Sequence, residues 1–280
     1  MSISRNALLG LSVVLCLPLA AMAGPPSKEA KKREAAWKAL EDARKAALET
    51  IFSLESYPDE DHGKAGQPLV DQKVHAVKNA FLELDPAIQA DVAKVMKLPE
   101  AKKRAFLAAA DAELNDWEKV IRRRIADLEV MKKNETVGAK KGEALPRGGV
   151  APTDQEREQI RLTNEYRMLL GRAPLAIDAR LVACAREHSA EMTKLDYFAH
   201  ESPTAGMRSP SERAAKVGVG RVAIGENIAM GYDSAKAAFD GWYTSSGHHR
   251  NMLESDWASM GTGRQGEHWT QNFAGAPPKK

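Results

Sequence analysis

The first half of the chain carries apolar residues at the spacing of amphipathic helices. From Ser27 to Lys133 the sequence is rich in Ala, Lys, Glu, Arg and Leu, which are good helix formers. The apolar stripes comprise Trp37, Leu40, Ala47, Leu48 and Ile51; Val70, Val74, Val77, Phe81 and Leu84; Ile88, Val92 and Val95; and Leu107, Ala110, Leu114, Trp117, Ile121, Leu128 and Met131. The stripes are narrow and lie among charged residues, so we expect residues 24–135 to form a bundle of three or four helices.

Two prolines are expected to divide this helical region. Asp85-Pro86 has the pattern of a helix start, with an N-cap acceptor followed by Pro at the first helical position. Pro99 precedes the longest apolar stripe, which runs from Leu107 to Met131. The sequence therefore predicts a helix that begins near Pro86 and another that follows Pro99.

Residues 136–152 have no apolar period and concentrate Gly, Pro and Lys, which is typical of a linker. The linker ends at Thr153-Asp154-Gln155-Glu156, a capping box whose hydroxyl and carboxylate accept hydrogen bonds from amides at a helix start. We expect a helical domain at 24–135 and a second domain at 153–275, with a tail at 276–280. Each has its own apolar pattern, so each is predicted to fold independently.

The second domain mixes helices with short strands. Helices are predicted from Thr153 to Leu170, from Asp178 onward, and from Ser234 to Tyr243. Short β-like segments are predicted at Arg221–Ile224, at Met260–Gly263 and at His268–Phe273. Short strands among helices indicate an α+β domain built in layers.

Composition and charge argue against nucleic-acid binding and indicate export. The net charge is +3, from 41 basic and 38 acidic residues, so the chain lacks the basic field of a nucleic-acid-binding protein. In residues 1–23 a single cation, Arg5, precedes an apolar run that ends in Ala21-Met22-Ala23. This pattern predicts a signal peptide cleaved after Ala23, and hence export to the periplasm or the extracellular space. A retained membrane anchor is the alternative, and no later segment could span a membrane. After cleavage Cys184 is the remaining cysteine, and its apolar neighbours predict a buried residue.

The histidines indicate where chemistry could occur. Five of the seven lie in the second domain: His188, His200, His248, His249 and His268. Glu226 lies among them in sequence, and each of these residues is near the end of a predicted element, where side chains can converge. His188 lies on an apolar stripe, so a buried, hydrogen-bonded role is expected for it.

Several motifs of the second domain resemble the CAP superfamily, which includes cysteine-rich secretory proteins, antigen 5 and plant pathogenesis-related class 1 proteins. The motifs are Thr163-Asn164-Glu165-Tyr166-Arg167, Tyr197-Phe198-Ala199-His200-Glu201-Ser202-Pro203, Gly225-Glu226-Asn227-Ile228-Ala229, Ser245-Ser246-Gly247-His248-His249-Arg250-Asn251 and His268-Trp269-Thr270-Gln271-Asn272-Phe273. They follow the family order and are most similar to its bacterial branch. The resemblance implies an α-β-α sandwich with a surface cleft, and it does not extend to the helical region.

The resemblance also implies a candidate metal site. In that family the cleft holds two His and two acidic residues. The two His match His200 and His268, and one acid matches Glu226. Ser245 stands where the second acid is expected. His248 matches a bacterial His-Arg pattern, next to an additional His249. Imidazole and carboxylate groups suit Zn²⁺, and three protein ligands leave a position for water. Because each ends or interrupts a different element of the sandwich, we expect His200, Glu226 and His268 to meet, with His248 as a fourth ligand or a nearby group. Period 2 along the last strand puts His268 and Thr270 on one face. Hydrogen bonding among these groups without any ion is the alternative.

Two functions remain open at this point. One is a binding module whose cleft takes a lipid, glycan or peptide, while the helical region mediates oligomer formation or envelope association. The other is a metal-assisted hydrolase that uses His200, Glu226, His248 and His268 as catalytic residues. A third arrangement, Ser245 or Ser246 with His248 as base and Glu226 orienting it, lacks the pattern of a nucleophile elbow. The missing second acid favours the binding module.

Overall fold

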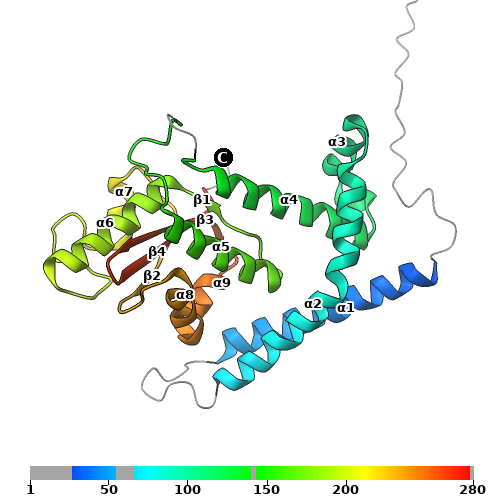
Figure 1. Cartoon of the computed structure of the whole chain (residues 1–280), viewed down its shortest axis with the longest axis horizontal. Helices are drawn as coiled ribbons and strands as arrows, with labels where there is room; N and C mark the ends of the chain where they lie inside the picture. The colour runs from blue at the N-terminus through cyan, green and yellow to red at the C-terminus, as the bar shows by residue number, and fades with distance from the viewer. Residues whose placement is uncertain (1–26, 55–65, 140–142, 278–280) are drawn as a thin grey trace, which may run out of the picture.

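The computed structural model describes residues 27–54, 66–139 and 143–277 (Figure 1). The predicted signal peptide at 1–23 lies outside these residues. Within the described part of the chain, no helix is both long enough and apolar enough to cross a membrane.

The N-terminal part is helical, as the apolar stripes predict. Its elements are α1 (Lys28–Ser53), α2 (Gln67–Met96), α3 (Glu100–Ala108), a short 3₁₀ helix (Asp111–Glu113) and α4 (Asp116–Thr136). Helices α1 and α2 pack along each other, and α4 runs from α3 toward the C-terminal domain (Figure 1). We call α1 to α4 the helical arm.

Two details of the arm differ from the sequence prediction. Helix α2 does not restart at Pro86 but continues through it. Leu84 and Ile88, on either side of Pro86, are buried in the same core, and that packing offsets the cost of an interior proline, about 3 kcal/mol. The long stripe after Pro99 is broken before α4, because Asn115 caps a new helix. Its side chain accepts from the Glu118 amide, and the Glu118 carboxylate accepts from the Asn115 amide.

The C-terminal domain is a layered structure around a four-stranded sheet. Its elements are α5 (Asp154–Leu169), β1 (Ala176–Ile177), α6 (Ala179–Leu195), α7 (Pro210–Lys216), β2 (Ile224–Ala229), α8 (Ala235–Thr244), α9 (Ser246–Leu253), β3 (Trp257–Gln265) and β4 (His268–Gly275). The strand order is β1-β3-β4-β2, with β1 parallel to β3 and the other pairs antiparallel. The predicted capping box at Thr153 and the predicted N-cap at Asp178 are both present.

Helices cover both faces of the sheet, which gives the expected α-β-α order of layers. Gly263 of β3 lies so close to α6 that a Cβ built there would be 2.0 Å from a backbone atom of that helix, so only glycine allows this approach. Thr262, the adjacent residue, points the other way and donates to Gln159 of α5 at 2.7 Å. Alternation along β3 therefore assigns α6 to one face and α5 to the other.

The position of β2 differs from the prediction. The expected strand at Arg221–Ile224 ends where β2 begins, so Glu226 lies inside a strand and not in a loop after one. Strand β1 and helices α7 and α9 were also not predicted, because each is too short to show a period of its own.

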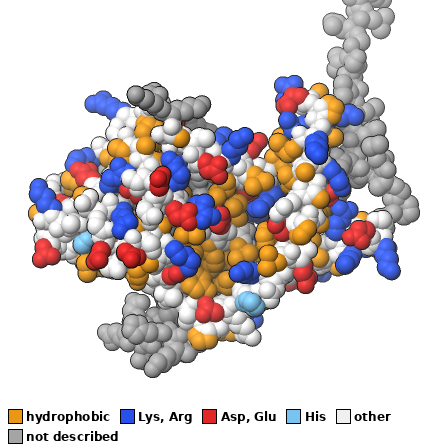
Figure 2. All heavy atoms as spheres, viewed as in Figure 1, with side chains coloured by type: hydrophobic (Ala, Val, Ile, Leu, Met, Phe, Trp, Pro, Cys, Tyr) orange, Lys and Arg blue, Asp and Glu red, His pale blue; other side chains and the backbone are white. Residues whose placement is uncertain are grey.

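The arm and the C-terminal domain share one hydrophobic core. Tyr166, Leu170 and Leu253 of the C-terminal domain belong to the same buried cluster as the apolar residues of the arm. Figure 2 shows apolar side chains gathered on one face between the arm and the sheet domain. Arg44 of α1 is buried and donates to the carbonyls of Leu169 and Met168 at 2.9 and 3.1 Å, which ties α1 to the end of α5. These contacts argue against two parts that fold independently.

The predicted linker is also attached to the C-terminal domain where the structure describes it. Helix α4 extends to Thr136. Buried Asn134 donates to the carbonyl of Leu175, just before β1, at 2.9 Å and accepts from the Ile177 amide of β1 at 2.8 Å. The Val150 amide donates to the Ala179 carbonyl at 3.0 Å. The domain boundaries at 136 and 152 stay a prediction.

Candidate functional site

A buried ion pair lies at the centre of the candidate site. Glu226 points from β2 toward α6 and α7, and its side chain is 2% exposed. Arg213 of α7, 1% exposed, donates to Glu226 Oε2 at 2.7 Å. The Arg213 guanidinium also donates to the carbonyls of Met207 and Arg208 at 3.1 and 2.8 Å. Burial of both charges is tolerated because each partner neutralises the other and both have further hydrogen bonds.

His200 covers this ion pair from the solvent side. Its Nδ1 lies 3.0 Å from Glu226 Oε1, while its side chain is 50% exposed. Because a carboxylate only accepts, Nδ1 carries a proton, and in the neutral form of the ring Nε2 is left as an acceptor. Within the described residues Nε2 has no hydrogen-bond partner. The predicted contact between His200 and Glu226 is therefore present.

Helix α6 holds the loop that presents His200. The helix ends at Asp196, which has a left-handed φ of 54° and turns the chain into that loop. His188 is fully buried, as expected, and its Nε2 lies 3.1 Å from the Ala199 carbonyl. Burial lowers the pKa of His188, which keeps the ring neutral. The same Nε2 is 3.7 Å from Glu226 Oε1.

Glu191 is a second anchor of the same loop. Its carboxylate accepts from Tyr197 Oη at 2.7 Å and from Thr204 Oγ1 at 2.5 Å. Burial alone would raise the pKa of Glu191, but the hydrogen bonds from Thr204 and Tyr197 outweigh it and lower the pKa. Burial and the bond to Glu191 raise the pKa of Tyr197 to about 12. The loop around His200 is thus fixed at several points.

His268 lies on the expected face of the sheet but apart from the ion pair. Its Nδ1 is 3.1 Å from Thr193 Oγ1 of α6, and Ser189 of α6 donates to Thr270 at 2.9 Å on the same face. Glu226 is in register with Asn272, four residues from His268 along β4. That separation corresponds to about 13 Å. Among the described residues His268 has no hydrogen bond or ion pair with His200 or Glu226, and their meeting in one site stays a prediction.

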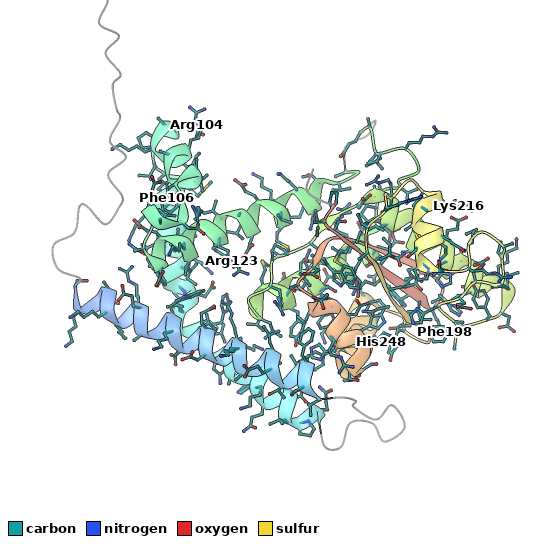
Figure 3. All side chains as sticks on the ribbon, turned by 180° about the vertical axis from the view of Figure 1, so that it is seen from behind. Arg104, Phe106, Arg123, Phe198, Lys216 and His248 are labelled. Carbon is teal, nitrogen blue, oxygen red and sulfur yellow. The ribbon has the colours of Figure 1, made fainter. Side chains whose placement is uncertain are left out.

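His248 lies on α9 and has a local partner. Its Nδ1 is 2.9 Å from Ser245 Oγ, three residues earlier, and its carbonyl accepts from Asn227 at 3.2 Å. Asn227 follows Glu226 in β2 and points to the opposite side of the strand, as its bond to Gln271 at 3.0 Å shows. Ser245 and His248 thus form a pair at the start of a helix. Glu226 does not orient His248, so the predicted Ser-His-Glu arrangement is absent from the described structure. Figure 3 labels His248 on its helix.

The four predicted zinc ligands do not converge on one point among the described residues. Among the described residues, no three His, Cys, Asp or Glu side chains lie close enough together to hold a metal ion. Glu226 Oε2 is already bound to the cation of Arg213, whose charge opposes a second cation on the same carboxylate. Two of the four predicted ligands, His200 and Glu226, are in contact. Zinc binding stays a prediction.

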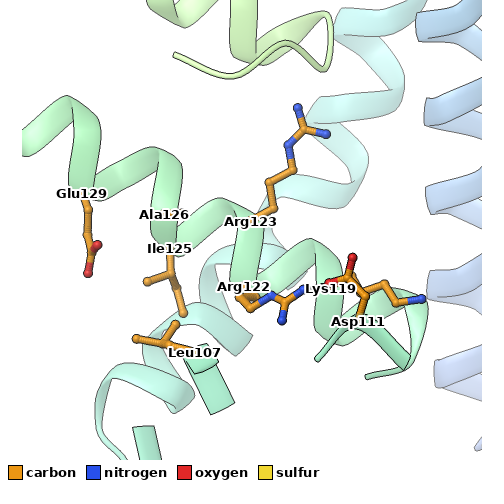
Figure 4. Close-up of a pocket in the computed structure, with 8 residues that line it drawn as sticks. All are labelled: Leu107, Asp111, Lys119, Arg122, Arg123, Ile125, Ala126 and Glu129. Carbon is orange, nitrogen blue, oxygen red and sulfur yellow. Dashed lines mark hydrogen bonds and ion pairs between the residues drawn. The ribbon is translucent and has the colours of Figure 1, made fainter. Parts of the chain in front are cut away.

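A surface hollow of about 530 Å³ lies elsewhere, between α3 and α4 (Figure 4). Leu107 and Ile125 line it with Arg122. Arg122 already donates to the Ala109 carbonyl and to Asp111, so its charge is satisfied by the arm itself. The buried ion pair remains the stronger candidate, because its charges lie away from solvent.

The model of the cysteine-rich secretory protein family, CAP, matches residues 160–273. That range contains all of α6, α7 and β2, and with them the His200–Glu226 pair. Residues 160–273 form a CAP domain. The expected α-β-α sandwich preceded by a helical region is thereby confirmed, and the helical arm lies outside the family match.

Two curated relatives each match a little over 120 residues of this chain. The chain is 37% identical over 122 residues to the uncharacterized protein YkwD of Bacillus subtilis, covering 43% of this chain and 47% of that protein. It is 36% identical over 121 residues to the uncharacterized membrane protein YlbC of the same organism, covering 43% and 34%. The chain thus spans less than half the length of these curated relatives.

Solved structures that resemble this chain also cover a little less than half of it. An extracellular protein containing a SCP domain from Bacillus anthracis is 30% identical, with a TM-score of 0.41 and coverage of 45% of each chain. An outer surface protein from Borrelia burgdorferi is 17% identical, with a TM-score of 0.42 over 46% of this chain and 98% of that one.

Sequence reasoning missed two members of the site. Arg213 lies on α7, a helix of seven residues that was not predicted, and nothing in the local sequence marks it as buried. Glu191 lies on α6 one turn after His188, so helical spacing could have placed both on the face toward the loop. Cys184 is buried as expected, and burial raises the pKa of its thiol to about 12, which makes it unreactive.

Proposed function

We propose that this chain is an exported bacterial CAP-domain protein that binds a small ligand at His200. One observation carries the proposal: a half-exposed imidazole is held by a carboxylate that is itself almost completely buried. Burying Glu226 and Arg213 is costly for the fold, and Nε2 of His200 is the group that this arrangement directs to solvent as an acceptor.

The chemistry of Nε2 selects the kind of ligand. A neutral imidazole acceptor pairs with a hydroxyl or an amide N–H, which glycans and peptides both offer. A lipid would bind through a hydroxyl of its headgroup. The predicted signal peptide supports export, to the periplasm or the extracellular space, where such ligands are found.

A hydrolase that uses the same residues has less support. His200 and Glu226 form a pair that could take a proton from water. Among the described residues, however, the set needed for metal assistance is not assembled, and no Ser or Cys nucleophile bonds His200. Binding is therefore the function that we adopt.

Histidine side-chain NMR of the metal-free protein tests the proposal. We would add an N-acetylated disaccharide, a tripeptide amide or a lysophospholipid, and assign the His200 resonance with His200→Gln. The disaccharide or the tripeptide should shift that resonance, and exposed His75 of α2 should not move. If none of the three probes shifts His200 at millimolar concentration, the site does not bind ligands of this class.

A further inference from the structure

Helix α9 is joined to the helical arm directly by Arg250 and indirectly by His249, which packs on Tyr243. Arg250 donates to the Leu54 carbonyl, just after the end of α1, at 2.7 Å. His249, the residue that interrupts the family's pattern, is fully buried, and its Nε2 lies 2.7 Å from Tyr166 Oη. The His249 ring also packs 4.7 Å from that of Tyr243, whose hydroxyl donates to Asp71 of α2 at 2.7 Å.

The same helix touches β2 at Glu226 with its other face. Asn251 donates to the Glu226 carbonyl at 3.2 Å and to Asn227 Oδ1 at 2.9 Å. Asn227 returns a bond to the His248 carbonyl at 3.2 Å. The backbone of the site carboxylate is thus attached to α9, while its side chain is attached to Arg213.

Helix geometry explains this division of contacts. Residues three apart, such as His248 and Asn251, lie on one face of a helix, and the two residues between them point away from it. With eight residues, α9 has little more than two turns, so it moves as one piece. It lies between the sheet and the α1–α2 pair (Figure 1).

We propose that docking of the helical arm on α9 positions Glu226, and through it His200. Arg250 and Asn251 are then positioning residues. Loss of the arm contacts allows α9 to shift, Asn251 then releases the Glu226 carbonyl, and the His200–Glu226 pair loses its geometry. This positioning rests on the proposed function, because it concerns the same site. Its test needs no ligand, so the positioning by the arm and the ligand binding at His200 can fail separately.

The experiment uses the full-length protein without ligand or metal, at one fixed pH. Two variants loosen the arm, Arg250→Ala from the α9 side and Asp71→Ala from the arm side, and Arg250→Lys retains a donor to Leu54. Glu83→Ala, an exposed carboxylate on the same helix as Asp71, is the matched control. Amide hydrogen exchange of α1 and β2 and the NMR resonance of the His200 ring are measured in each.

Both loosening variants should speed exchange in α1 and in β2 by about fivefold, the effect of one lost net hydrogen bond, and both should shift the His200 resonance. Arg250→Lys should restore the wild-type resonance, and Glu83→Ala should leave it unchanged. Faster exchange in α1 with an unmoved His200 resonance in both variants would overturn the proposal. Unchanged exchange in α1 would overturn it too, because these contacts would then not hold the arm.

Discussion

Removing Arg213 should destabilise the protein far more than removing a surface cation from the same helix. In Arg213→Met the Glu226 carboxylate remains 2% exposed and loses its 2.7 Å partner. An unpaired buried charge costs about 3 to 5 kcal/mol. Lys216→Met is the matched control, since Lys216 lies on the same helix and pairs with Glu187 at 2.8 Å while both side chains are nearly half exposed. Exposed pairs contribute about 1 kcal/mol or less.

Urea unfolding followed by circular dichroism measures both losses. Adding Glu226→Gln to Arg213→Met removes the stranded charge, so the double variant should be more stable than Arg213→Met alone. Two results would contradict the view that Glu226 is a buried charge dependent on Arg213. One is that Arg213→Met lowers the free energy of unfolding no more than Lys216→Met does. The other is that the double variant lowers it by the sum of the two single changes.

Other parts of the molecule allow three further tests. Arg44→Ala should lower the free energy of unfolding by about 2 to 3 kcal/mol, whereas Lys45→Ala, at an exposed position, should change it little. The arm and the CAP domain should still unfold in a single transition in Arg44→Ala. Separate transitions in calorimetry would contradict the shared core. Burial lowers the pKa of His249 to about 3, so the unfolded chain binds the proton first and stability falls as pH drops below about 6.5. Between pH 7 and 5 the wild type should lose about 2 kcal/mol more than His249→Phe in urea titrations, and equal losses would show that the ring is not held neutral. Titration calorimetry near pH 7.5 would measure zinc affinity. If zinc binds at the His200–Glu226 pair, its affinity should fall about tenfold in His200→Ala and stay unchanged in His268→Ala. The opposite pattern would place the metal at His268.

The local features of the fold were predictable because they depend on neighbours in sequence. The capping box at Thr153, the N-cap at Asp178 and the buried face that carries His188 all follow from spacing within one or two turns. The motifs around His200 and Glu226 identified the CAP domain, and these two side chains lie 3.0 Å apart in the structure.

Tertiary packing decided the rest. Pro86 stays inside α2 because residues on both sides of it reach one core, which local propensity cannot reveal. Arg213 enters the site from a short helix, and His268 is kept from it by four residues of strand. The composition of 136–152 predicted a linker and two independent parts, yet Asn134 and Arg44, both buried residues, join the arm to the CAP domain through hydrogen bonds. A sequence lists such polar residues, but only the folded chain determines which of them lose water and must find partners.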